Sequence, residues 1–150
     1  MVKSSSLSIK TNCIPGHESG YIGAGGPPIE TDKGWLLIYH AVYDTAEGYV
    51  YTATAALLDI DDPTKILARM TEPLFTPEFE YEQHGVVNNV VFPTGHSLFE
   101  DTLYIYYGAA DNSIALATSS ISMLLDWLRD DSSNSDFAIQ SNLSINSAPG

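Results

Sequence analysis

The chain has 150 residues, and its 19 acidic side chains outnumber the 6 lysines and arginines, which gives a formal net charge of -13. Such an excess of carboxylates repels nucleic-acid backbones and anionic lipid headgroups, so neither is expected as a partner. The one cysteine, Cys13, excludes an internal disulfide and a multi-cysteine zinc site.

The apolar segments are too short to cross a membrane as helices. None approaches the ~20 residues that a spanning helix needs, and the first ten residues, MVKSSSLSIK, lack the apolar core of a signal peptide. We therefore expect a cytoplasmic protein with no membrane partner. A chain of this length suffices for one domain, which would hide about 68–70% of its unfolded surface.

Short apolar runs punctuated by Gly, Pro and Asp predict an antiparallel, mostly β protein. In chain order the predicted strands are GWLLIYHAV (34–42), YVYTATAALLDI (49–60), KILARMTEPLF (65–75), VVNNVVFPTGHSLF (86–99), TLYIYYGAA (102–110) and SIALATSS (113–120). The dipeptides at 100–101 and 111–112 fall where tight hairpin turns would. DIDDPTKI resembles a calcium loop only superficially, because the glycine and final glutamate of that loop are missing, and it is interpreted as a turn.

One helix is predicted near the end of the chain, over SISMLLDWLRD at residues 120–130, with Ser122 as its N-terminal cap. The segment that follows, 132–150, is rich in Ser and Asn and is expected to be a flexible tail. Residues 1–19 are poorly patterned and are interpreted as a lead-in. The folded part is therefore predicted to span 20–131.

A weak internal repeat relates two hairpins. WLLIYHAV followed by YTATAALLD resembles TLYIYYGAAD followed by IALATSSIS, and the overlay places His40 against Tyr107. Small residues along the second strand of each hairpin suit the crowded sheets of a β-propeller. At about 40–50 residues per blade the chain holds about three blades, whereas propellers close with roughly 4–8. The prediction is a portion of a propeller.

Two polar residues at strand ends have both a structural and a functional interpretation. His40 ends an apolar strand, where it is either a satisfied core group or a ligand contact. Asp111 closes YYGAAD, where it is either a turn former or a site residue. His17, His84 and His96 lack metal-ligand spacing and are expected at the surface, and no metal site is predicted.

Several motifs together resemble glycoside hydrolase family 130, the β-mannoside phosphorylases and related mannosidases. They are IGAGGPPIETDKGWLLIYHAV (22–42), YTATAALLDIDDPTKILARMTEPLF (51–75), VVFPTG (90–95) and TLYIYYGAADNSIALAT (102–118). They occur in order over roughly residues 20–129, and the resemblance is to the C-terminal half of the family domain. It implies a five-bladed β-propeller with its active site in the central cavity.

The resemblance also implies an activity and a set of site residues. Family members cleave β-mannosides with inversion, by phosphate to give mannose 1-phosphate or in some branches by water. His40 matches a phosphate-binding histidine, Tyr51 a phosphate-site tyrosine, and Asp111 a sugar-binding aspartate. The general-acid aspartate and the phosphate-binding arginines belong to the half that is not in this chain. We therefore expect no catalytic residue here, no activity of the chain alone, no metal or organic cofactor, and inorganic phosphate as co-substrate.

One departure from the family pattern keeps alternatives open. Family phosphorylases commonly carry lysine directly before IGAG as a further phosphate contact, and this chain has Tyr21 there. The alternatives are a hydrolytic β-mannosidase or a non-catalytic carbohydrate-binding fragment, and a protein-interaction propeller is a third. Expected partners are a β-mannoside oligosaccharide or mannose 1-phosphate, and self-association through open blade edges.

Overall fold

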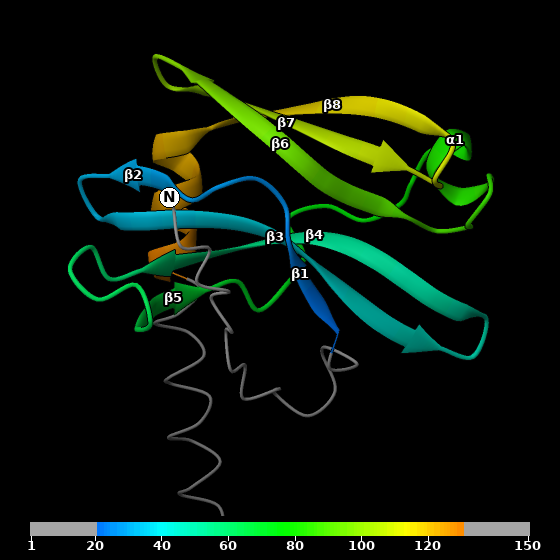
Figure 1. The fold of residues 1–150 in the computed structure, drawn as a ribbon, viewed down its shortest axis with the longest axis horizontal. Helices are drawn as coiled ribbons and strands as arrows, with labels where there is room; N and C mark the ends of the chain where they lie inside the picture. The colour runs from blue at the N-terminus through cyan, green and yellow to red at the C-terminus, as the bar shows by residue number, and fades with distance from the viewer. Residues whose placement is uncertain (1–20, 131–150) are drawn as a thin grey trace, which may run out of the picture.

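In the computed structural model, which describes residues 21–130, two antiparallel sheets pack face to face (Figure 1). The first sheet has the order β1-β3-β4-β5, with β2 also paired to β3, and the second has the order β6-β7-β8. The strands are β1 (Ile22–Ala24), β2 (Ile29–Thr31), β3 (Gly34–Thr45), β4 (Gly48–Leu58), β5 (Ile66–Arg69), β6 (Val91–Phe99), β7 (Thr102–Ala109) and β8 (Ser113–Ser120). A short helix, α1 (Glu80–Gln83), precedes β6, and a second helix covers 121–130. The predicted lead-in (1–19) and tail (132–150) lie outside the described residues.

The all-β prediction with one helix near its end is confirmed, and α1 was not predicted. The described residues form two sheets, whereas about three blades were expected from length. Within the described residues, the stretch 65–99 contributes only β5 and β6 to the sheets. The chain between them forms a connection and α1 instead of further sheet.

The internal repeat corresponds to equivalent hairpins in the two sheets. His40 of β3 pairs with Ala53 of β4, and Tyr107 of β7 pairs with Ala115 of β8. The β7–β8 turn has φ values of 49° at Ala110 and 52° at Asp111, the left-handed backbone that tight hairpins require. The sequence overlay therefore identified positions that are structurally equivalent.

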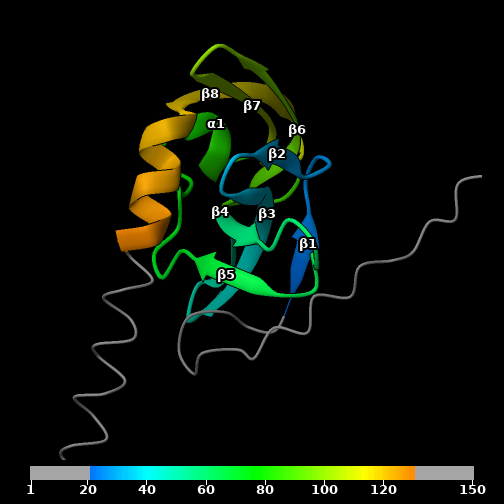
Figure 2. The ribbon, with the colours of Figure 1, turned by 90° about the vertical axis from the view of Figure 1, so that its left-hand side faces the viewer.

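The main core lies between the two sheets and against helix 121–130. Leu36 and Ile38 of β3 meet Leu103 and Ile105 of β7, the matching positions of the repeat. The helix adds Leu124, Leu125 and Leu128 to this cluster, and Figure 2 shows it on the side opposite β1. None of the helices within 21–130 is long and apolar enough to span a membrane.

Helix 121–130 is capped by Ser120 and not by Ser122 as predicted. The Ser120 hydroxyl oxygen accepts the backbone N–H of Met123 at 3.2 Å. The Ser122 backbone N–H instead donates at 3.1 Å to Oδ1 of Asp101, which lies in the β6–β7 turn. The cap lies earlier because β8 runs directly into the helix.

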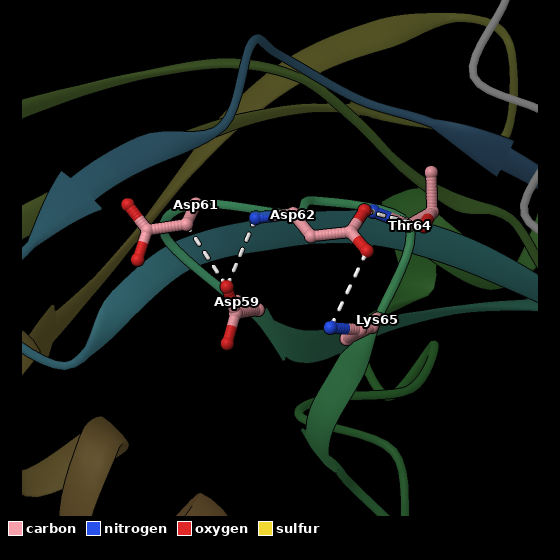
Figure 3. A network of polar contacts seen from close by, with 5 residues as sticks. All are labelled: Asp59, Asp61, Asp62, Thr64 and Lys65. Carbon is pink, nitrogen blue, oxygen red and sulfur yellow. Dashed lines mark hydrogen bonds and ion pairs between the residues drawn. The ribbon is translucent and has the colours of Figure 1, made fainter.

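In the turn between β4 and β5, acidic side chains accept hydrogen bonds from backbone N–H groups of the same turn (Figure 3). Asp59 Oδ1 accepts the N–H groups of Asp61 and Asp62, both at 2.9 Å. Asp62 accepts the Thr64 hydroxyl at 2.6 Å and lies 3.5 Å from Lys65 Nζ. Hydrogen bonds from Thr64 lower the pKa of Asp62. The segment is the turn that the sequence predicted.

Candidate functional site

The predicted site residues lie toward one end of the two sheets. The β3–β4 turn, the β7–β8 turn and α1 all lie at the right-hand end of Figure 1. Equivalent hairpins of the repeat point the same way, because the strands of both sheets run in matching directions. His40 and Tyr51 approach this end from the first sheet, and Asp111 from the second.

His40 is half-buried on the face of β3 that looks toward β6. Its ring lies 4.2 Å from the ring of Phe92 and 6.0 Å from that of Tyr51, measured between ring centroids. Burial lowers the pKa of His40 below its usual 6.5, so the neutral imidazole prevails at neutral pH. Its Nδ1 atom is buried and has no hydrogen-bond partner in the described structure. A buried polar atom without a partner is costly and calls for an explanation.

A glycine of the IGAGG motif makes room for the His40 ring. Gly23 of β1 lies directly opposite His40 in the β1–β3 register. A Cβ atom at position 23 would lie 2.2 Å from Cε1 and 2.8 Å from Nε2 of His40. Close packing therefore requires glycine at position 23. The IGAGG motif, which supplies Gly23, and the VVFP motif, which supplies Phe92, hold the His40 imidazole between them.

The same glycine-rich segment also covers His96, which was predicted to lie at the surface. A Cβ atom at Gly26 would lie 2.7 Å from His96 Nδ1. His96 is half-buried as a result, and burial lowers its pKa. Of the other predicted surface histidines, His84 is exposed and His17 lies outside the described residues.

Tyr51 extends the site along β4. Its N–H donates to the Asn89 carbonyl at 2.9 Å, which ties the first sheet to the segment before β6. Tyr51 also lines a pocket of about 260 Å³ with Tyr21, Val42 and Tyr49. Tyr21, which stands where family phosphorylases commonly have lysine, therefore shares a pocket with the predicted phosphate-site tyrosine, and its side chain is 66% exposed.

Asp111 is exposed in the β7–β8 turn, and no hydrogen bond engages its side chain within the described part of the chain. A carboxylate that only shaped its turn would bond nearby backbone N–H groups. The turn is linked to Tyr51 through the segment 87–90. Ala110 donates to the Val90 carbonyl at 3.0 Å, and Val87 donates to the Ala110 carbonyl at 3.2 Å. No direct contact joins Asp111 to His40 or Tyr51 among the interactions of residues 21–130.

A buried carboxylate, Glu82, was missed by the sequence analysis. It is 2% exposed in α1, where Oε2 accepts the N–H groups of Glu78 and Phe79 at 2.7 and 3.0 Å. Its Oε1 accepts the Tyr107 hydroxyl at 2.6 Å. Burial, with the bond to Glu82, raises the pKa of Tyr107. Because both carboxylate oxygens of Glu82 accept hydrogen bonds from within the chain, Glu82 fixes the connection to β7.

A second pocket, of about 470 Å³, is lined by residues of this connection, of β7 and β8 and of helix 121–130, among them Phe79, Glu82, Tyr107, Leu116 and Trp127. No three His, Cys, Asp or Glu side chains within 21–130 lie close enough together to hold a metal ion.

The chain matches known proteins over most of its length. The family model of β-1,4-mannooligosaccharide phosphorylases matches residues 7–130. A 1,2-β-oligomannan phosphorylase of Thermoanaerobacter sp. is 49% identical over 100 residues, which cover 67% of this chain and 33% of the relative. A β-1,4-mannooligosaccharide phosphorylase of Ruminococcus albus is 42% identical over 118 residues, covering 77% of this chain and 35% of the relative.

Solved structures agree with the sequence relatives. The β-1,2-mannobiose phosphorylase of Listeria innocua, in complex with β-1,2-mannobiose, has a TM-score of 0.70 and 43% identity over 77% of this chain and 32% of its own. A family 130 structure described among hydrolases that target β-1,2-mannosidic linkages in Candida mannan has a TM-score of 0.62 and 33% identity, covering 69% of this chain and 31% of its own.

The likeness to these family 130 structures confirms the partial propeller, and each relative is about three times as long as the matched segment. The chain thus spans about a third of the length of the curated relatives it matches. It belongs to glycoside hydrolase family 130.

Proposed function

We propose that this chain forms the C-terminal part of a β-mannoside phosphorylase, which converts a β-mannoside and inorganic phosphate to mannose 1-phosphate and a shortened sugar. In this reaction a phosphate oxygen bonds to the anomeric carbon of the terminal mannose, from the face opposite the glycosidic oxygen that leaves. The general acid that protonates the leaving oxygen, and the arginines that bind phosphate, would come from the rest of the propeller.

One observation carries the proposal for this chain's own residues. The His40 imidazole is half-buried beside Tyr51, with Nδ1 buried and unpartnered. A neutral imidazole can donate one N–H to an anion, and a tyrosine hydroxyl can donate another. In a chain with a net charge of -13, phosphate must be held by such directed donors and not by general positive potential.

Asp111 is proposed to bind hydroxyls of the mannose whose bond is cleaved. Its carboxylate is exposed at the same end of the sheets and is not used in its own turn. Hydrogen bonds from sugar hydroxyls to a carboxylate strengthen as the ring approaches an oxocarbenium-like transition state. His40 and Tyr51 would thus serve the nucleophile, and Asp111 the sugar.

The first test is calorimetric titration of the 150-residue chain with mannose 1-phosphate and separately with inorganic phosphate. His40→Ala should abolish binding of both, whereas His84→Ala, at an exposed histidine, should leave it unchanged. Binding that survives His40→Ala would contradict the assignment of His40.

The activity itself is tested in a chimera. Residues 21–130 replace the matching segment of the Listeria innocua phosphorylase, whose solved structure aligns with this chain at 43% identity. We expect release of mannose 1-phosphate from β-1,2-mannobiose and phosphate, and its loss on His40→Ala. A folded chimera that releases free mannose without needing phosphate would indicate the hydrolytic alternative.

A further inference from the structure

The chain between α1 and β6, residues 84–90, is a compact loop that folds back on α1. The Val90 N–H donates to the Glu82 carbonyl at 3.0 Å. Within this α1–β6 loop, the Gly85 N–H donates to Asn88 Oδ1 at 3.2 Å. Loops whose ends lie close together pack as compact units. A displacement at one point is therefore expected to move the whole loop.

The α1–β6 loop contacts both sheets, next to a proposed site residue in each. In the first sheet, the Tyr51 N–H donates to the Asn89 carbonyl at 2.9 Å. In the second sheet, Ala110 directly precedes Asp111, and its N–H and its carbonyl are both hydrogen-bonded to the loop, at 3.0 and 3.2 Å. One loop therefore joins the strand of Tyr51 to the turn of Asp111.

Gly85 sets how closely the loop approaches the β7–β8 turn. A Cβ atom at position 85 would lie 2.3 Å from the carbonyl oxygen of Ala110 and 2.7 Å from its Cβ atom. Ala110 is fully buried, with a left-handed φ of 49°. Because the clash is with a buried residue and its backbone, no flexible side chain can turn aside to relieve it. The close approach therefore requires glycine at position 85.

The start of the loop is anchored to the strand that carries this turn. Glu82, in α1, accepts the Tyr107 hydroxyl at 2.6 Å through its buried carboxylate. Tyr107 lies in β7, which leads directly into the β7–β8 turn. The loop is thus held on β7 at its start and on the residue before Asp111 further along.

We infer that the α1–β6 loop fixes the position of Asp111 relative to Tyr51, and that Gly85 is its positioning residue. The inference rests on the proposed function, in which Tyr51 serves phosphate and Asp111 the mannose. In-line attack needs these two groups in a fixed relation, because small misplacements of reacting groups cost large factors in rate. Mannose 1-phosphate carries both groups on one molecule, so its binding is sensitive to the spacing of the two residues.

Amide hydrogen exchange on the ligand-free 150-residue chain tests the contact itself. Gly85→Ala should cause a loss of protection at the Ala110 and Tyr51 amides, which donate to the loop. Gly95→Ala is the matched control, because a Cβ atom there meets nothing within 4 Å, and it should leave both amides protected. Unchanged protection in a folded Gly85→Ala chain would overturn the inference.

A second pair of variants decides the question if Gly85→Ala does not fold. Asn88→Ala removes the acceptor of the Gly85 N–H and should also reduce protection at Ala110 and Tyr51. Asn88→Asp keeps an acceptor at the same place and should restore the protection. Equal protection in the Asn88→Ala and wild-type chains would then overturn the inference.

Calorimetry on the same chains measures the consequence for binding. Gly85→Ala should weaken mannose 1-phosphate binding by roughly tenfold or more, the loss expected when a hydrogen bond to a charged acceptor is broken. The affinity for inorganic phosphate should stay unchanged, because Tyr51 is held in β4 by its pairing with β3. A general loss of folding would weaken both ligands alike.

The double variant shows whether Gly85 acts through Asp111. Asp111→Asn should weaken mannose 1-phosphate binding in the wild-type chain and add little in the Gly85→Ala chain. Fully additive losses, or equal weakening of both ligands by Gly85→Ala, would overturn the inference. A wild-type chain that binds neither ligand would contradict the proposed function of these residues, and the exchange rates would still decide the role of the loop.

Discussion

Gly23 and His40 face each other across the β1–β3 pair so closely that the glycine has no room for a side chain. A Cβ atom there would lie 2.2 Å from His40 Cε1. The ring is bounded by Phe92, whose centroid is 4.2 Å away. Two sequence motifs, IGAGG and VVFP, therefore act together on the orientation of one imidazole.

Gly23→Ala should displace the His40 ring. Overpacking of this kind costs about 1–3 kcal/mol of unfolding free energy, and a shift of about 1 Å at a reacting group costs on the order of 100-fold in activity. We expect both losses, measured by urea unfolding of the chain and by phosphorolysis in the chimera. Gly95→Ala is the control, because a Cβ there meets nothing within 4 Å. Equal effects of the two substitutions would contradict the role of Gly23.

The lowered pKa of His40 predicts that the chain loses stability in acid. Because burial lowers the folded-state pKa below 6.5, the unfolded chain binds the proton first as pH falls. The contribution of neutral His40 to the unfolding free energy is fully present above about pH 6.5 and is lost as pH falls through the folded-state pKa. Burial also lowers the pKa of His96, so His96 likewise reduces the unfolding free energy as pH falls.

Imidazole NMR signals test this prediction directly. His40 should titrate at a lower pH in the folded chain than in the urea-unfolded chain, and His40→Gln should reduce the loss of unfolding free energy between neutral and mildly acidic pH. His96→Gln should leave the His40 part of that loss in place. A His40 signal that titrates in the folded chain at the same pH as in the unfolded chain, or at a higher pH, would refute the prediction.

Tyr21→Lys should strengthen phosphate binding. Tyr21 is exposed and shares a pocket with Tyr51, so an ammonium group there can reach an anion near Tyr51 without burying its charge. A hydrogen bond to a charged group contributes about 1.5–3 kcal/mol, which corresponds to roughly tenfold or more in affinity. Calorimetry with inorganic phosphate measures the change, and Glu30→Lys in β2 controls for the general gain in positive charge. If both variants bind phosphate equally well, position 21 is not part of the site.

The sequence predicted best the positions of residues within strands, because the neighbouring residues of a strand determine which face each side chain lies on. The apolar runs of β3 and β7 and the strand of small residues that follows each of them aligned the two hairpins, so the overlay of His40 on Tyr107 was correct. The sequence could not reveal that these two equivalent residues differ in their hydrogen bonds. Tyr107 donates to Glu82, whereas His40 Nδ1 has no partner within the described residues, because α1 brings the Glu82 carboxylate to the Tyr107 hydroxyl.

Long-range packing explains what was missed. Glu82 lies in a polar sequence, EYEQHG, which is typical of an exposed segment, and it is buried only because Glu78, Phe79 and Tyr107 together satisfy its oxygens. His96 gave no signal of burial, since the residue that covers it, Gly26, is far away in the chain. Both effects depend on contacts between segments that no local pattern encodes.

Tyr107→Phe should destabilise the chain by about 1–3 kcal/mol, because it leaves Glu82 Oε1 buried without its hydrogen-bond donor. Glu82→Gln should cost less, since an amide can still accept from the backbone and pair with the Tyr107 hydroxyl. Tyr106→Phe, at a more exposed tyrosine of the same strand, is the control and should lie within about 0.5 kcal/mol of wild type. Urea unfolding measures all three, and a Tyr107→Phe chain as stable as the Tyr106→Phe chain would show that the Glu82 bond contributes nothing.

Asp111→Asn should separate sugar binding from folding. Asparagine tolerates the left-handed backbone that Asp111 adopts at φ 52°, so the unfolding free energy should stay within about 0.5 kcal/mol of wild type. The loss of the carboxylate should still weaken mannoside binding in the chimera by roughly tenfold or more, because hydrogen bonds to a charged acceptor contribute about 1.5–3 kcal/mol. Asp126→Asn, exposed on helix 121–130, is the matched control. Unchanged mannoside affinity in a folded Asp111→Asn chimera would mean that this aspartate serves the turn alone, and the sugar would then have to be bound by residues outside this chain.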